Sequence, residues 1–170
     1  MTTAKRRFGQ NFLVDRNVAD RIVAGVAPRA DETIVEIGSG QGALTARLLE
    51  TAGRVVAIEF DRELVPFLRT KFARVANLHL IEADALTTDF CAAIAPAPRT
   101  RVVANLPYNI ATAILQRLIE QRECIGEMVL MLQREVVDRV TAEPGSSERG
   151  YLSVLVEAYC KAEKLFDVPP

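Results

Sequence analysis

The stretch Ile34-Val-Glu-Ile-Gly38-Ser-Gly40-Gln-Gly42 decides the fold of this chain. Its first four residues are mostly apolar, which is typical of a strand buried on both faces of a parallel sheet. Three glycines follow at alternate positions, directly before a helical pattern that starts at Ala43. Glycines there allow a tight turn and a close backbone approach to a ligand, with helix N–H groups pointing at it. The spacing differs from the dinucleotide pattern G-x-G-x-x-G, so a plain tight turn is the alternative.

Short apolar runs alternate with helical patterns along the rest of the chain. This alternation predicts a doubly wound, mostly parallel α/β sheet of Rossmann-like type with right-handed crossovers. The predicted strands are Ile34–Ile37, Val55–Ile58, Leu78–Ile81, Val102–Ala104, Met128–Leu132 and Lys164–Val168. The first predicted helix begins after Asp15. The others cover Ala43–Thr51, Arg62–Phe72, Thr88–Ile94, Ile110–Gln121, Arg134–Ala142 and Tyr151–Tyr159.

The composition excludes several classes of protein. The 170 residues are 49% apolar and 25% charged, which is typical of one globular domain and excludes disorder. The purest apolar run, Met128–Leu132, is too short to span a membrane, and no apolar segment follows the basic start as in a secretion signal. Cys91, Cys124 and Cys160 lie 33 and 36 residues apart, without metal-ligand spacing. We therefore expect three reduced thiols in a cytoplasmic protein without a structural metal.

Charge is spread unevenly along the chain. Residues 1–30 contain six Lys or Arg and two Asp, a balance of +4, and the remaining residues sum to −5 because the whole chain carries −1. Such a basic segment is either a solvated arm or an edge that faces phosphate groups.

Acidic residues follow the second and third predicted strands, where ligands of an open parallel sheet bind. Glu59 lies 21 residues after Gly38, where an acid can accept hydrogen bonds from both hydroxyls of a ribose. Asp61 can cap the next helix, which leaves Glu59 without a structural role. Asp84, followed by the small Ala85, suits an adenine amino group that lies against the backbone, and a helix cap is the alternative.

The segment Asn105-Leu-Pro-Tyr108 after the fourth strand is the sharpest signal. The Asn105 amide and the carbonyl of the rigid Pro107 supply two hydrogen-bond acceptors beside the aromatic face of Tyr108. These three groups suit an exocyclic amine on a planar base, because the two acceptors can bind its two N–H groups while the aromatic ring stacks on the base. A plain loop is the alternative. His79, the only histidine, is interpreted as a packed or edge residue of the third strand.

Together these motifs resemble those of methyltransferases that transfer a methyl group from S-adenosylmethionine (SAM) to an amino group. Four segments narrow the resemblance to the rRNA adenine N6,N6-dimethyltransferases, and among them to the bacterial small-subunit enzymes whose loss gives kasugamycin resistance. The resemblance runs from about Lys5 to Pro170. The segments are Arg7-Phe-Gly-Gln-Asn-Phe-Leu13, Asn105-Leu-Pro-Tyr-Asn-Ile110, Met131-Leu-Gln-Arg-Glu-Val136 and Gly150-Tyr-Leu-Ser-Val154.

The resemblance implies a class I SAM-dependent methyltransferase sheet, with SAM as cofactor and S-adenosylhomocysteine (SAH) as product. Asn105 and the Pro107 carbonyl would orient the target N6, while Tyr108 stacks on the flipped base. The implied cofactor-binding residues are Asn11 and Leu13 at the methionine end, Gly38 and Gly40 in the turn, Glu59 at the ribose, Asp84 and Ala85 at the adenine, and Asn105.

The function implied is dimethylation of two adjacent adenosines in the 3′-terminal hairpin of 16S rRNA during small-subunit biogenesis. The protein would act in the cytoplasm as a monomer, without a membrane or metal, and the basic arm, Arg134 and Arg149 would contact RNA. Two other functions compete with this one. The chain could be a macrolide-resistance methyltransferase of 23S rRNA, or a non-catalytic RNA-binding factor of ribosome assembly.

The resemblance also implies a domain organisation. Residues 1–14 would form a basic arm that contributes to the cofactor site, and residues 15–170 a methyltransferase domain that lacks its last strand. A C-terminal helical RNA-binding domain would be absent, so this chain would keep the cofactor pocket and act poorly on RNA. One departure from the family is Glu157, where a glutamine is expected, on a helix away from the chemistry.

Overall fold

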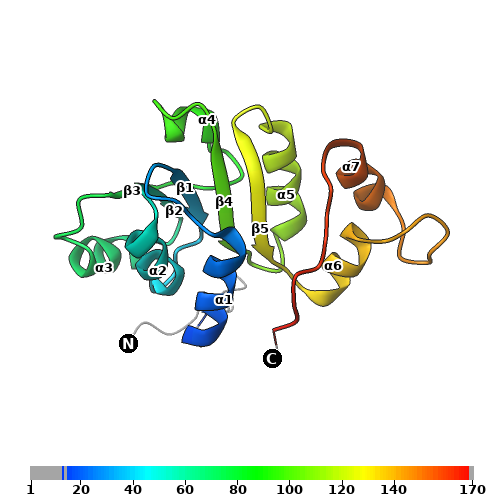
Figure 1. The fold of residues 1–170 in the computed structure, drawn as a ribbon, viewed down its shortest axis with the longest axis horizontal. Helices are drawn as coiled ribbons and strands as arrows, with labels where there is room; N and C mark the ends of the chain where they lie inside the picture. Colours follow the sequence, from blue (N-terminus) through cyan, green and yellow to red (C-terminus); the bar gives the residue numbers. More distant parts are fainter. Residues whose placement is uncertain (1–12, 14, 169–170) are drawn as a thin grey trace.

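Five parallel strands form one sheet in the order β3-β2-β1-β4-β5 in the computed structural model, which describes Leu13 and residues 15–168 (Figure 1). The chain runs from β1 outward through β2 to β3 and then returns to the other side of β1. The order therefore reverses between β1 and β4, where open α/β sheets bind their ligands. The strands are β1 (Thr33–Ile37), β2 (Arg54–Glu59), β3 (Leu78–Glu82), β4 (Thr100–Asn105) and β5 (Ile125–Met131).

Seven helices lie in the described part of the chain, and each overlaps a predicted one. Asp15 caps the first helix, since its carboxylate accepts a hydrogen bond of 2.8 Å from the N–H of Asn17. The helices are α1 (Arg16–Val26), α2 (Ala43–Thr51), α3 (Leu64–Lys71), α4 (Phe90–Ile94), α5 (Ala111–Glu120), α6 (Arg134–Val140) and α7 (Tyr151–Tyr159).

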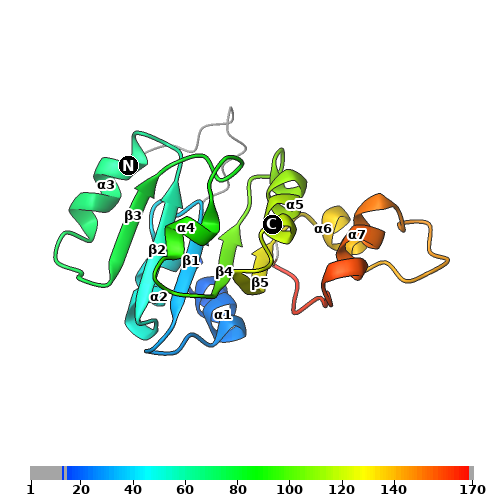
Figure 2. The same cartoon turned by 90° about the horizontal axis from the view of Figure 1, so that it is seen from above.

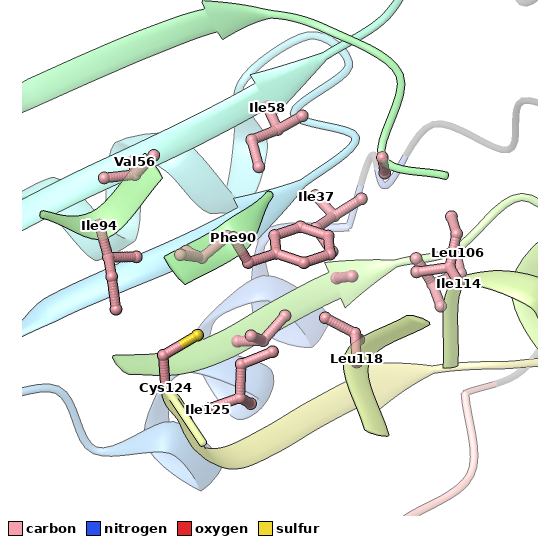
Figure 3. Close-up of a cluster of buried hydrophobic side chains, with 14 of the residues drawn as sticks. Ile37, Val56, Ile58, Phe90, Ile94, Leu106, Ile114, Leu118, Cys124 and Ile125 are labelled. Carbon is pink, nitrogen blue, oxygen red and sulfur yellow. The ribbon is translucent and has the colours of Figure 1, made fainter. Parts of the chain in front are cut away.

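Each face of the sheet packs against its own helices, so the central strands are buried on both sides. Because side chains alternate along a strand, Ile34 of β1 packs on the face covered by α1 and α2. Val35 and Ile37 point to the opposite face and join the cluster around Phe90 of α4 and residues of α5. Figure 3 shows Phe90 in the middle of this cluster. Burial on both faces is therefore confirmed for β1, β2 and β4, whereas β3 and β5, at the edges of the sheet, are only partly buried.

Helices α6 and α7 lie beside α5, beyond the β5 end of the sheet (Figure 2). Leu115 and Ile119 of α5 pack against Leu152 and Val156 of α7. Glu157, the departure from the family, lies on α7 as expected.

The sixth predicted strand, Lys164–Val168, is wrong, because the structure contains no strand there. A strand needs a neighbour for its backbone hydrogen bonds, and this segment forms no ladder within the described part of the chain. Its apolar side chains are buried in another way. Phe166 and Val168 pack on the α1 and α2 face of the sheet, and the Arg21 guanidinium lies 3.9 Å from the centre of the Phe166 ring.

The prediction of three reduced thiols is also wrong. Cys91 of α4 and Cys124, directly before β5, form a disulfide with their Cα atoms 5.5 Å apart, and Cys160 is a free thiol. Their distance along the chain offered no sign of this proximity. The Gln121 side chain helps to bring the two cysteines together, because it binds the backbone at the start of α4. Its amide oxygen accepts a hydrogen bond of 2.7 Å from the N–H of Phe90, and its amide nitrogen donates one of 3.1 Å to the Thr88 carbonyl.

Two features are absent from Leu13 and residues 15–168. They contain no helix long and apolar enough to cross a membrane. They also contain no group of three or more His, Cys, Asp or Glu side chains placed to hold a metal ion.

Candidate cofactor and substrate site

A cavity of about 250 Å³ lies at the carboxyl ends of β1, β2, β3 and β4. It brings together most of the residues that the sequence singled out. Tyr108 is not among the residues that line it, and Asn11 lies outside the described residues. The predicted residues that line it are Leu13, Gly38, Gly40, Glu59, Asp84, Ala85, Asn105 and Pro107.

The glycine turn after β1 needs its glycines for backbone reasons. Gly38, Gly40 and Gly42 have φ values of +73°, +55° and +77°, in a region that residues with a side chain rarely adopt. The turn is held from outside as well, because the Lys71 ammonium of α3 donates a hydrogen bond of 2.7 Å to the carbonyl of Gln41. At Gly42, an added Cβ would lie 2.8 Å from Cε2 of Phe72.

Gly42→Ala is expected to lower the free energy of unfolding by about 2–3 kcal/mol, since a left-handed alanine costs about 1–2 kcal/mol and the contact with Phe72 adds to it. Gly145→Ala is the matched control, because Gly145 has a φ of +94° with nothing within 4 Å of the added Cβ. Urea denaturation of both variants measures the difference. Equal losses in the two variants would show that the contact with Phe72 has no effect.

Glu59 lies at the end of β2, is 5% exposed and lines the cavity. One carboxylate oxygen accepts a hydrogen bond of 2.8 Å from the N–H of Gly40, and the other accepts one of 2.9 Å from the N–H of Asp61. The expectation that Glu59 has no structural role is therefore wrong, since it ties β2 to the glycine turn. A carboxylate can accept about four hydrogen bonds, so these two leave capacity for the hydroxyls of a ligand.

Asp84 follows β3 and is not a helix cap. One of its carboxylate oxygens accepts a hydrogen bond of 2.9 Å from the N–H of Leu86, which makes a local turn. The cap of α4 is Asp89, whose carboxylate accepts from the N–H of Ala92 at 2.9 Å. The turn at Asp84 fixes a carboxylate at the cavity wall.

The Asn105–Tyr108 segment leaves the sheet from β4. Leu106 is buried and its N–H donates to the Met131 carbonyl at 3.2 Å, which anchors the segment to β5. The Pro107 carbonyl accepts a hydrogen bond of 3.2 Å from the N–H of Ile110, and its second lone pair can accept another. Tyr108 is 48% exposed beside the cavity, with ring surface open to solvent.

Glu36 also lines the cavity, although the sequence motifs did not predict it as a site residue. It is 1% exposed, and one of its carboxylate oxygens accepts hydrogen bonds from the Thr45 hydroxyl at 2.6 Å and the Ser39 hydroxyl at 3.0 Å. Burial raises the pKa of Glu36 to about 7 and the charge of Glu59 adds to this rise, although the two hydroxyls lower it. The sequence did contain a sign of a site residue here, because Glu36 is the one charged residue in the otherwise apolar predicted strand Ile34–Ile37.

Glu36→Gln is expected to change how stability depends on pH. The folded-state pKa of about 7 lies above the ordinary value of 4.5, so the folded chain binds this proton more tightly than the unfolded chain does. The resulting stability is complete below pH 4.5 and is lost as the pH rises through 7. Urea denaturation should show that the wild type loses about 2–3 kcal/mol relative to the variant between about pH 5 and 8. If the free energies of unfolding of the wild type and the variant change with pH by the same amount, this expectation is wrong.

Other lining residues were missed because they are apolar or carry a common side chain. Phe60, which directly follows Glu59, is 55% exposed at the cavity, and Leu86, Asn109 and Ile114 line it from later segments. Only Phe60 could have been predicted from the sequence, because it directly follows Glu59, the residue predicted to bind the ribose.

The fold and this site define a Rossmann-like methyltransferase domain. The chain belongs to the ribosomal RNA adenine dimethylase family, whose sequence pattern it matches over residues 1–170. It is 49% identical to the ribosomal RNA small subunit methyltransferase A of Hahella chejuensis over 98% of the chain. The chain spans 61% of the length of that relative.

Solved structures agree with this assignment. A dimethyladenosine transferase from Plasmodium falciparum is similar with a TM-score of 0.79 and 29% identity, over 89% of this chain and 54% of that one. The 23S rRNA methyltransferase ErmE has a TM-score of 0.70 and 31% identity, over 79% and 53%. An RNA methyltransferase from Salinibacter ruber, in complex with SAH, has a TM-score of 0.56 and 25% identity, over 68% and 72%.

Proposed function

We propose that the whole protein to which this chain belongs transfers methyl groups from SAM to N6 of two adjacent adenosines in the 3′-terminal hairpin of 16S rRNA. One observation carries the proposal. Glu59, Asp84 and Asn105 come from the ends of three strands and line a single cavity behind a glycine turn. Membership of the ribosomal RNA adenine dimethylase family supports it.

The residues of the cavity fit SAM. Glu59 offers acceptors for the two ribose hydroxyls, and Asp84 offers one for the adenine amino group. Ile37, Ile58 and Leu86 add apolar surface for a planar base. Leu13 also lines the cavity, and with Asn11 it is proposed to close over the methionine end of the cofactor.

The chain's residues can prepare a target adenine for methyl transfer. Bound SAM supplies an electrophilic methyl group on a sulfonium. Adenine N6 is a poor nucleophile because its lone pair is delocalised into the ring. The Asn105 amide oxygen and the Pro107 carbonyl would accept from the two N6–H groups and stabilise the positive charge that develops on nitrogen. Their fixed positions would also align N6 for in-line attack.

Tyr108 is proposed to stack on the target base after it leaves the RNA. Extruding a base costs a few kcal/mol, which favours an adenosine in a loop over one in a regular helix. The exposure of Tyr108 beside the cavity suits this role. RNA contacts are proposed for the basic arm and for Arg134, which is exposed. Arg149 fits that role less well, because it pairs with Glu157 and donates to the Ala142 carbonyl.

A 23S rRNA substrate is the enzymatic alternative. The small-subunit relative is 49% identical over 98% of this chain, whereas ErmE is 31% identical over 79%. We therefore favour small-subunit rRNA as the substrate. A cytoplasmic location and a monomeric state remain part of the proposal. Incubating the whole protein with labelled SAM should label 30S particles at the two adenosines. Labelling of naked 23S rRNA alone would contradict the proposal.

A non-catalytic role in ribosome assembly is the alternative of another class. The cavity of this chain argues against it, because the acids and the amide needed for cofactor binding are in place together. Calorimetry with SAM tests this on the 170-residue chain itself, which is proposed to comprise an arm (residues 1–14) and a methyltransferase domain (residues 15–170). Binding of SAM favours an enzyme, and a lack of binding favours the assembly factor.

A further inference from the structure

The disulfide joins Cys91 of α4 to Cys124, directly before β5. We propose that these two cysteines form a reversible thiol–disulfide exchange site for small thiols of the glutathione class. Its oxidised state holds the segment of residues 84–88 in place, and the first three residues of this segment line the cofactor cavity. The exchange site stands apart from the proposed function. Only its effect on the cavity rests on that function, because SAH is taken as the ligand there.

The two sulfur atoms of the pair differ in their access to solvent. Cys124 is 5% exposed and belongs to the apolar cluster around Phe90 (Figure 3). Cys91 packs against the same cluster and is partly exposed. Because a thiolate can attack only a sulfur that it reaches, exchange begins at Cys91.

Both oxidation states of the pair find partners on the same backbone. Cys124 Sγ lies 3.3 Å from the Gln121 carbonyl oxygen, and Cys91 Sγ lies 3.9 Å from Oε1 of Glu123. Each thiol of the reduced pair can therefore donate a hydrogen bond from the place where its sulfur already lies. Disulfides in the cytoplasm, where the proposed function places the protein, are mostly transient or redox-sensing. The bond is thus suited to open and close without another arrangement of α4.

The exchange balances with glutathione as the reductant. A glutathione thiolate attacks Sγ of Cys91, the bond between the two cysteines breaks, and Cys124 leaves as a thiolate that takes up a proton. A second glutathione thiolate attacks the glutathione sulfur of this mixed disulfide, which releases Cys91 and glutathione disulfide. Two electrons and two protons thus pass from two glutathione molecules to the pair, and glutathione disulfide reverses the reaction.

Hydrogen bonds connect the exchange site to the 84–88 segment. The N–H and the hydroxyl of Thr88 donate to the Asp84 carbonyl at 3.0 and 2.8 Å. The Gln121 side chain donates to the Thr88 carbonyl at 3.1 Å and accepts from the N–H of Phe90 at 2.7 Å. Two links therefore hold the 84–88 segment and α4 to the end of α5, the Gln121 side chain and the disulfide. Either link keeps this part of the cavity ordered for a ligand, whereas loss of both frees it.

Counting free thiols at defined ratios of glutathione to glutathione disulfide tests the exchange site. The 170-residue chain is equilibrated under native conditions, quenched with acid and reacted with a maleimide in denaturant. We expect one free thiol at the oxidising end and three at the reducing end, in a single transition. Cys160→Ser should keep the transition and lower both counts by one. One thiol at every ratio, or three at every ratio, overturns the proposal.

The rate of reduction identifies the sulfur that is attacked. Glu123→Gln should accelerate reduction by glutathione about threefold at low ionic strength, because the carboxylate close to Cys91 Sγ repels an approaching thiolate. Glu143→Gln is the matched control, since Glu143 is an exposed acid in the loop between α6 and α7, and its rate should equal that of the wild type. Equal rates in wild type and Glu123→Gln contradict attack at Cys91.

Calorimetry with SAH tests the hold on the cavity. Breaking one link, by reducing the wild type or by Gln121→Ala in the oxidised chain, should weaken SAH binding by no more than about threefold. Reducing Gln121→Ala breaks both links and should weaken binding about tenfold or more. Linkage then requires saturating SAH to shift the thiol transition of Gln121→Ala toward the oxidised form by the same factor.

Gln116→Ala is the control for the calorimetry, because Gln116 lies on the same helix and does not line the cavity. Its SAH affinity should match that of the wild type in both oxidation states. If Gln121→Ala weakens SAH binding equally in the oxidised and reduced chains, the disulfide does not hold the cavity and that part of the proposal is wrong. If no form of the chain binds SAH, the proposed function is wrong, and the thiol counts still decide the exchange site.

Discussion

Replacing Asn105 with alanine is expected to slow methyl transfer by about 10³-fold in the whole protein, because removing one group that stabilises charge at the reacting atom costs about 10²–10³ in rate. Asn105 is the last residue of β4 and lines the cavity together with Pro107. Without its amide oxygen, one N6–H group of the target adenine loses its acceptor. The remaining Pro107 carbonyl cannot hold the amine in one orientation, so alignment is lost as well as charge stabilisation.

Single-turnover transfer of labelled methyl groups to 30S particles measures this effect. SAH affinity should fall far less than the rate, so that the loss appears in the chemical step. Asn17→Ala is the control, because Asn17 is an exposed amide on α1 and does not line the cavity. Turnover of Asn105→Ala close to that of the wild type would refute the orienting role.

Replacing Glu59 with alanine is expected to weaken SAM and SAH binding by about 10²-fold or more. Hydrogen bonds to a charged group are worth about 1.5–3 kcal/mol each, and two ribose hydroxyls would lose their acceptor. The structure adds a second cause. Glu59 accepts from the N–H groups of Gly40 and Asp61, so its removal also frees the turn that lies against the ligand.

Calorimetry on the 170-residue chain gives the dissociation constants. Glu82→Ala is the matched control, since Glu82 is the register partner of Glu59 on β3 and its side chain is 41% exposed. Its affinity should stay close to that of the wild type. An unchanged affinity in Glu59→Ala would count against the ribose assignment.

Features set by local sequence were predicted well. The run Ile34–Ile37 and the corresponding runs of β2 and β4 are apolar on nearly every residue because helices cover both faces of the sheet there. The glycines at positions 38, 40 and 42 marked the turn because their positive φ values exclude most other residues. Since strand ends of a parallel sheet meet at one edge, the positions of Glu59, Asp84 and Asn105 at such ends were enough to place them together.

Features set by distant contacts were not predictable in the same way. Lys164–Val168 has the composition of a strand, but a ladder requires a neighbour that composition does not supply. The pairing of Cys91 with Cys124 depends on how α4 packs over the end of α5. The bond from Gly40 to Glu59 joins residues 19 positions apart, so no local pattern revealed it. Tyr108 was expected at the target base, and its exposure leaves that role a proposal.

The disulfide also has a practical consequence for labelling chemistry. The sequence contains three cysteines and two of them are bonded, so the native chain has a single thiol, at Cys160. Burial raises the pKa of this thiol, and because the thiolate is the reactive form, alkylation at neutral pH is slow. Cys160 directly follows α7 and does not line the cofactor cavity. A thiol-reactive fluorophore would therefore attach at one defined position, from which ligand binding could be followed without occupying the site.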